Sequence, residues 1–183
     1  MASTSETVIL SRDCEATLIP AGNKITLPSG TQAVITQALG DTYTVIANGS
    51  MARIDGKDAD AIGKPVVAVK VPAAAAAVGP LDEKLVWDQM KTCYDPEIPV
   101  NIVDLGLVYD CKATSLTEGG NRVEVKMTLT APGCGMGASI AGDVERKIRT
   151  VPGVTDVHVE LVWEPNWNQT MMTEAARLQL GLM

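Results

Sequence analysis

The stretch Thr128-Leu-Thr-Ala-Pro-Gly-Cys-Gly-Met-Gly137 indicates how the second half of the chain folds, because it joins a strand to a helix through a tight turn. The apolar and β-branched residues that lead into it are typical of a strand, which we predict over 122–130. The glycines around Cys134 are typical of a turn, and a helix is predicted over 135–150, where a Pro-Gly pair ends it. The stretch therefore predicts a strand–turn–helix unit with one cysteine in its turn.

The predicted helix over 135–150 has an apolar stripe and a charged side. Ile140, Val144 and Ile148 recur four residues apart, which places them on one face of a helix. Five charged residues of the same segment are expected to face water: Asp143, Glu145, Arg146, Lys147 and Arg149. The pattern predicts an amphipathic helix with one buried face.

The rest of the region 81–183 alternates between helical and strand-like periods. A helix follows a proline, two strands flank a glycine-rich hairpin turn, another strand follows the long helix, and a last helix begins at a Thr cap. The predicted ranges are 81–93, 107–113, 122–130, 135–150, 155–163 and 173–180. This order predicts an α+β fold, an α-β-β-α-β-α sandwich with helices on one side of a short mixed sheet.

The first 70 residues predict a small all-β domain. Short strands separated by Gly, Pro and Asn turns recur about every ten residues, which favours a small open barrel or sandwich. The predicted strands are 15–19, 32–37, 42–47 and 52–54. Residues 71–80, Val-Pro-Ala-Ala-Ala-Ala-Ala-Val-Gly-Pro, predict a linker, because this alanine run carries no apolar stripe. We therefore expect domains at 1–70 and 81–183.

The composition limits the classes of partner. A net charge of −7 argues against nucleic acid and anionic membranes, because such partners need clustered Lys and Arg. There is no apolar run of membrane-spanning length and no signal-peptide pattern at the N-terminus, so we expect a cytoplasmic protein. The four cysteines and the single histidine lack metal-binding spacing, which argues against a self-contained zinc or ferredoxin-type site.

Cys134 is the residue best suited to carry chemistry. A thiol at a helix N-terminus meets unpaired backbone N–H groups and the positive end of the helix dipole, and both favour the thiolate. Gly133, Gly135 and Gly137 remove side-chain bulk, so that a ligand, a cluster or a partner thiol can approach. The alternative is a structural turn, in which the glycines serve close packing and the cysteine is buried.

The other cysteines and the histidine fit structural roles better. Cys93 ends the apolar stripe of the first helix and Cys111 lies in a strand, so we expect both to be packed. Cys14 precedes a strand, where core and surface are equally arguable. His158 alternates with apolar neighbours along its strand, so we expect it to point outward.

A second stretch, Asp95-Pro-Glu-Ile-Pro-Val-Asn-Ile-Val-Asp-Leu-Gly-Leu-Val-Tyr109, carries three carboxylates on a loop that two prolines stiffen. Asp95, Glu97 and Asp104 can bind a metal, orient a thiol or cap turns and helix ends. Turn capping is the default for carboxylates at such irregular spacing. Gly106 fits a backbone position that tolerates no Cβ.

Three motifs in this order and spacing resemble a known family. They are the acidic stretch of 95–109, the run Met127-Thr-Leu-Thr-Ala-Pro-Gly-Cys134, and the tail 163–181 with its two tryptophans. Together they resemble the small domain shared by SufT, by PaaD of phenylacetate degradation and by the eukaryotic cytosolic iron–sulfur targeting factor. The resemblance covers about residues 81–183. The N-terminal β region is similar to the SufT type, and no cysteine follows Cys134, unlike in PaaD-like members.

The resemblance implies a non-enzymatic, accessory role in iron–sulfur cluster assembly or cluster transfer to client proteins. Cys134 takes the place of the family's reactive cysteine. Asp95 and Glu97 match its acidic-proline motif, and Asp104 matches the acidic residue of the second block. The implied ligand is a transient iron–sulfur cluster or iron at Cys134, with no tightly bound cofactor. The implied partners are iron–sulfur scaffold or carrier proteins and client apoproteins, and a homo-oligomer is a natural extension.

Two other functions use the same residues. A single-cysteine thiol or redox enzyme needs a base beside the thiol, and the only histidine, His158, is distant in sequence. A pure protein-binding adaptor needs no reactive thiol. Replacing Cys134 by Ser separates the adaptor from the other two, and turnover of a peroxide or disulfide separates the enzyme from the assembly factor.

Overall fold

The computed structural model describes residues 5–66, 81–131 and 135–182 of the chain. These residues form two compact units, an N-terminal one and a C-terminal one. The expected linker, residues 71–80, lies outside the described residues, so the domain boundaries stay a prediction. Within the described ranges, no helix is long and apolar enough to cross a membrane.

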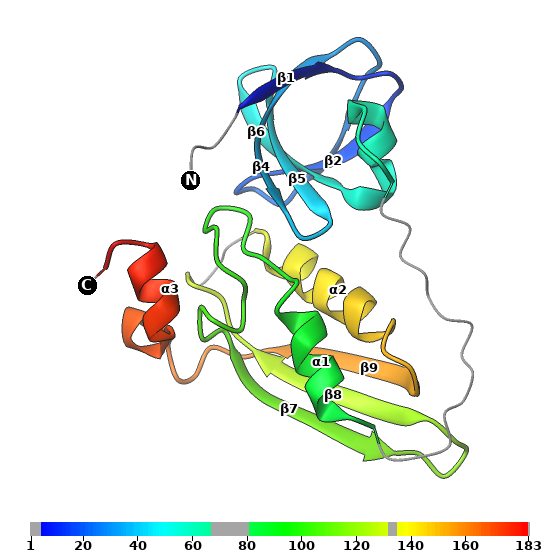
Figure 1. The fold of residues 1–183 in the computed structure, drawn as a ribbon, viewed down its shortest axis with the longest axis vertical. Helices are drawn as coiled ribbons and strands as arrows, with labels where there is room; N and C mark the ends of the chain where they lie inside the picture. The colour runs from blue at the N-terminus through cyan, green and yellow to red at the C-terminus, as the bar shows by residue number, and fades with distance from the viewer. Residues whose placement is uncertain (1–4, 67–80, 132–134, 183) are drawn as a thin grey trace. The chain divides into compact units, whose positions relative to one another are not determined.

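The N-terminal unit is one six-stranded antiparallel sheet that curls around its own core (Figure 1). The strand order is β1-β4-β5-β6-β2-β3, with β1 and β3 at the two edges. The bounds are β1 Glu6–Ile9, β2 Cys14–Leu18, β3 Lys24–Leu27, β4 Gln32–Leu39, β5 Thr42–Ala47 and β6 Ser50–Asp55, followed by the 3-10 helix η1 Gly56–Ile62. The predicted all-β character of this region is confirmed.

Residues with a strong turn preference mark the ends of strands in this unit, and this is why several of its strands could be predicted from the sequence. Asn48 and Gly49 have φ values of 51° and 79°, which is the left-handed conformation that a two-residue hairpin turn between β5 and β6 requires. The inward residues of the sheet, such as Val45 and Ile54, are fully buried. Cys14 belongs to this core, and its burial raises the pKa of the thiol to about 11.

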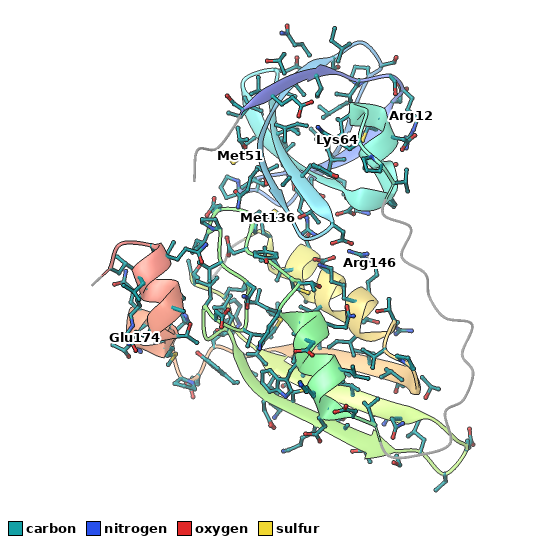
Figure 2. All side chains as sticks on the ribbon, viewed as in Figure 1. Arg12, Met51, Lys64, Met136, Arg146 and Glu174 are labelled. Carbon is teal, nitrogen blue, oxygen red and sulfur yellow. The ribbon has the colours of Figure 1, made fainter. Side chains whose placement is uncertain are left out.

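Three elements of the N-terminal unit were not predicted: β1, β3 and η1. The two strands have four residues each, too few for a clear alternation signal. The helix η1 is held by a residue that is distant in sequence, because the guanidinium of Arg12 donates to both carboxylate oxygens of Asp60, at 2.6 and 2.8 Å. Figure 2 shows Arg12 beside this helix. Arg12 also donates to Asp58 at 3.0 Å. A local sequence pattern does not show such contacts.

The C-terminal unit is an α+β sandwich, as predicted. Its sheet has the order β7-β8-β9, with β7 antiparallel and β9 parallel to the central strand. The helices α1 and α2 lie over one face of this sheet, and α3 lies near the loop between α1 and β7 (Figure 1). The bounds are α1 Glu83–Met90, β7 Val108–Ser115, β8 Asn121–Met127, α2 Gly137–Ile148, β9 Val154–Leu161, the 3-10 helix η2 Gln169–Met171 and α3 Glu174–Gln179.

Capping residues and apolar stripes set these helices. Asp82 caps α1 by accepting the N–H of Lys84 at 3.0 Å, and Thr173 caps α3 by accepting the N–H of Ala176 at 3.2 Å. The predicted stripe of α2 is confirmed, because Ile140, Val144 and Ile148 are buried. The helix begins at Gly137, two residues later than predicted, and β8 ends at Met127 instead of residue 130.

The expectation that all five charged residues of α2 face water is wrong for two of them. Asp143 and Lys147 are both buried, and only 6% of the surface of each residue is exposed. The ammonium of Lys147 donates to the carbonyl of Thr92, a residue just after α1, at 2.6 Å. The same ammonium forms an ion pair with Asp143 at 3.6 Å. The end of α1 covers this side of α2, and a paired charge can be buried where its hydrogen bonds are met.

Candidate functional site

The structure describes only part of the predicted glycine turn. Cys134 and Gly133 lie outside the described residues, so their predicted roles remain predictions. Gly135 lies in a turn that leads into α2, and Gly137 is the first residue of that helix. A Cβ on Gly137 would lie 2.6 Å from Cδ1 of Leu129, so the missing side chain lets the helix start pack close to the segment that leaves β8.

Asp95 is buried and caps the turn that follows it. Its Oδ1 accepts the backbone N–H of Glu97 at 2.8 Å and that of Ile98 at 3.2 Å. Burial raises the pKa of the Asp95 carboxyl above its ordinary value, while the two N–H groups act in the opposite direction. The contacts of Asp95 are those of a turn-capping carboxylate.

Glu97 differs from Asp95 because its side chain is exposed. The two residues lie in a loop whose ends are tied together. Tyr94 and Asn101 form an antiparallel bridge, and the N–H of Ile102 donates to the carbonyl of Cys93 at 3.0 Å. The loop therefore has a defined base, which the two prolines alone could not provide.

Asp104 is half-buried and is held by Asn101. The side-chain amide of Asn101 donates to Oδ2 of Asp104 at 2.6 Å. The side-chain oxygen of Asn101 accepts the N–H groups of Val103 at 3.1 Å and Asp104 at 2.9 Å. Sequence reasoning did not identify Asn101, although an Asn followed by an Asp three residues later is a local turn signal.

The C-terminal tail holds the same loop from another direction. The N–H of Thr173 donates to the carbonyl of Asp104 at 2.9 Å, and the indole N–H of Trp167 donates to the carbonyl of Leu105 at 2.8 Å. Gly106 has φ +72°, and a Cβ there would lie 2.2 Å from the carbonyl oxygen of Met171. The prediction that Gly106 tolerates no Cβ is confirmed. The sequence did not predict that the tail contacts this loop, because the residues that form these hydrogen bonds are over 60 positions apart.

A groove with a volume of about 680 Å³ opens beside this loop and is lined by residues of the sheet, loop and tail. Its apolar walls include Val108, Val162 and Met171, while Lys126 and Glu164 contribute one charge of each sign. The phenol of Tyr109, another lining residue, donates to the carbonyl of Pro165 at 2.7 Å. The groove is thus formed where the tail crosses the start of β7.

The three carboxylates do not converge into a metal site in the described parts of the chain. No group of three or more His, Cys, Asp or Glu side chains within residues 5–66, 81–131 and 135–182 is arranged to hold a metal ion. His158 is exposed on β9, as predicted, and Cys93 is buried, as predicted. Cys111 is half-buried, and burial raises its thiol pKa to about 11.

Comparison with known sequences finds relatives of the C-terminal unit. The sequence model of a family described as "Iron-sulfur cluster assembly protein" matches residues 83–161. An "Fe-S protein maturation auxiliary factor" of Porphyromonas gingivalis is 46% identical over 94 residues, covering 51% of this chain and 86% of the relative. The corresponding SufT protein of Staphylococcus aureus is 41% identical over 88 residues, covering 48% of this chain and 96% of the relative.

A third match reaches a larger protein. An "Iron-sulfur cluster carrier protein" of Deinococcus radiodurans is 34% identical over 71 residues, which cover 39% of this chain and 19% of that protein. The two auxiliary factors, in contrast, are matched over most of their length. The match to the family model, residues 83–161, includes the stretches of sequence around Cys134 and around the three carboxylates. The chain therefore belongs to the family of SufT-type iron–sulfur cluster assembly proteins.

Proposed function

We propose that this protein is a non-enzymatic accessory factor that assists iron–sulfur cluster assembly or transfers clusters to client apoproteins, with Cys134 as its working thiol. The observation that carries the proposal is the near full-length match to relatives named as maturation auxiliary factors, at 41% and 46% identity. Scaffold or carrier proteins and client apoproteins are the partners that such a role requires.

The other three cysteines are poor candidates for the working thiol. Cys14 and Cys93 are each 1% exposed, so a cluster or a partner thiol cannot reach them without local opening. The raised pKa of about 11 at Cys14 and Cys111 keeps both thiols protonated at neutral pH, and the thiolate is the form that binds iron. Cys134, which stands between Gly133 and Gly135 in the sequence and three residues before the start of α2, is the remaining cysteine.

A single thiol favours transient binding of the cargo. A cluster normally has four protein ligands, and the described residues offer no group of three or more that could complete a cage. A cluster or iron bound at Cys134 would share its remaining ligands with a scaffold, a client or a second copy of the chain. Such an incomplete site favours handover over storage, which fits a carrier or accessory function.

The proposal is tested by replacing Cys134 with Ser in cells that depend on this chain. The specific activity of a [4Fe–4S] dehydratase, normalised to its protein level, should fall to that of cells lacking the protein. The matched control is Cys111→Ser, a half-buried thiol that should leave dehydratase activity unchanged. Iron and sulfide analysis of the anaerobically purified protein should show less of both in the Cys134 variant. Normal dehydratase activity in that variant would instead support an adaptor without a working thiol.

A further inference from the structure

The sheet of the C-terminal unit has one face that its helices leave open. The helices α1 and α2 lie over the other face (Figure 1). Every second residue of the central strand β8 is buried, and the residues between them, Arg122, Glu124 and Lys126, are exposed. Because successive side chains of a strand point to opposite faces, these exposed residues belong to the open face.

Two hollows adjoin on this open face, because Lys126 lines both of them. One is the groove of about 680 Å³ beside the acidic loop, whose walls are mostly apolar. The other has a volume of about 420 Å³ and is lined mostly by charged residues, among them Glu124 and Glu160. Along β9 and its continuation, His158, Glu160 and Val162 share one side, so the charged hollow leads into the apolar groove. The two hollows together are called the trough below.

Carboxylates outnumber ammonium groups along the trough. Its acidic residues are Asp110, Glu124, Glu160 and Glu164, and its basic residues are Lys112 and Lys126. Lys112 pairs with Asp110 at 3.0 Å, and Lys126 pairs with Glu160 at 3.6 Å. Within residues 5–66, 81–131 and 135–182, the exposed side chains of Glu124 and Glu164 form no ion pair and no hydrogen bond. The trough therefore has one uncompensated carboxylate in each hollow.

Solvation alone does not account for this face. A sheet face adapted only to water is polar along its whole length, whereas this one ends in a groove lined by Val162, Pro165 and Met171. An apolar hollow next to uncompensated carboxylates is complementary to a partner that carries an apolar side chain and a positive charge. The spacing follows from β9, where Val162 stands four residues beyond His158, the register partner of Glu124. Four strand residues span about 13 Å.

We propose that the trough binds an extended protein segment in which an apolar residue and a lysine or arginine stand four positions apart. The apolar side chain occupies the groove, and the basic side chain pairs with Glu124. Glu164, which lines the groove, adds to the attraction for positive charge. This interaction goes beyond the proposed function, because it needs neither a cluster nor the thiol of Cys134.

The test measures binding of a synthetic peptide to the full-length protein by fluorescence anisotropy. The labelled peptide Lys-Ser-Gly-Ser-Leu-Ser-Gly-Ser-Lys has a lysine four positions from the leucine on each side, so it fits in either chain direction. It should bind about tenfold more tightly than a peptide with serine in place of the leucine, and than one with glutamate in place of both lysines. Equal binding of the three peptides would overturn the proposal.

Reversing the two uncompensated charges should reverse the preference. In Glu124→Lys with Glu164→Lys, the lysine peptide should bind about tenfold more weakly and the glutamate peptide should become the tighter ligand. The matched control, Asp88→Lys with Glu118→Lys, changes the net charge equally at exposed positions outside the trough and should bind like wild type. An equal loss in this control would show a general attraction to an acidic protein and would reject the trough.

A milder variant covers the case in which two added lysines disturb the sheet. Glu124→Gln with Glu164→Gln should keep the melting temperature within about 2 °C of wild type and still weaken binding of the lysine peptide several-fold. Unchanged binding in this variant would contradict the proposal. Cys134→Ser should bind the peptide like wild type, so the thiol role and the trough are tested separately. Loss of dehydratase activity in Cys134→Ser with equal binding of the three peptides keeps the proposed function and rejects the trough.

Discussion

The two units of the protein use their charged and polar side chains for different purposes. In the N-terminal unit, Arg12 pairs with Asp58 and Asp60, and these contacts fasten η1 to the sheet. In the C-terminal unit, Asn101 and the tail hold a loop whose acidic side chains include the half-exposed Asp104 and the exposed Glu97. The sequence model of the family matches residues 83–161, which lie in the C-terminal part of the chain. The comparison shows that these polar contacts fasten a helix to the sheet in the first unit, whereas in the second unit they hold the loop that carries the acidic side chains.

The largest effect that we expect from this comparison is that the C-terminal unit folds without the N-terminal unit. Residues 81–183 expressed alone should fold, because a domain of about 100 residues can bury its own core. A single cooperative transition in thermal unfolding, followed by circular dichroism, would confirm it. A soluble fragment without a cooperative transition would instead show that the two units need each other to fold.

Two glycines with similar backbones give the next largest effect. Gly106→Ala should destabilise the protein by about 2–5 kcal/mol, because a left-handed conformation and a clash with the Met171 carbonyl add up. Gly30→Ala, at φ +82° with nothing within 4 Å, should cost only about 1–2 kcal/mol. Urea unfolding of the two variants measures both. Equal losses of unfolding free energy in the two variants would mean that the Met171 carbonyl does not lie against Gly106 in solution.

The variant Glu97→Gln tests whether the acidic loop contributes to activity without contributing to the stability of the fold. The side chain is exposed, so removing its charge should change the melting temperature by no more than about 2 °C. If the loop contacts a client or scaffold, the activity of the [4Fe–4S] dehydratase in cells should nevertheless fall. Asp13→Asn, a carboxylate of the N-terminal unit that accepts the N–H of Ser29 at 2.8 Å, is a control that should leave this activity intact. Normal activity of the Glu97 variant removes this residue from the site.

The smallest effect concerns the pH dependence of stability at Asp95. Burial raises the pKa of this carboxyl in the folded protein, so the native state binds the proton more readily than the unfolded chain. Its contribution to stability therefore falls as the pH rises through the folded-state pKa. Asp95→Asn keeps the acceptor oxygen and should be slightly more stable than wild type at neutral pH, with a difference that shrinks towards about pH 4. A difference that is the same at every pH would contradict this assignment.

The order of the α-helices and strands of the C-terminal unit could be predicted from local pattern, as could four of the six strands of the N-terminal unit. The stripe of Ile140, Val144 and Ile148 and the Asn48-Gly49 turn are local signals, and both are confirmed. The pattern did not predict that Asp143 and Lys147 are buried, because periodicity assigns every charge to the solvent side. Their burial depends on Thr92, which lies far away in sequence and supplies the carbonyl that makes a buried ammonium tolerable.

The sequence by itself determined the family, the strand before Cys134, the helix after it and the three carboxylates of the acidic loop, because each depends on residues that are close together in the chain. Only the tertiary structure decided how that loop is held. The indole N–H of Trp167 reaches the carbonyl of Leu105, and the N–H of Thr173 reaches the carbonyl of Asp104. Hydrogen bonds between residues so far apart leave no periodic signal in a sequence, since they form only after the fold has brought the two segments together.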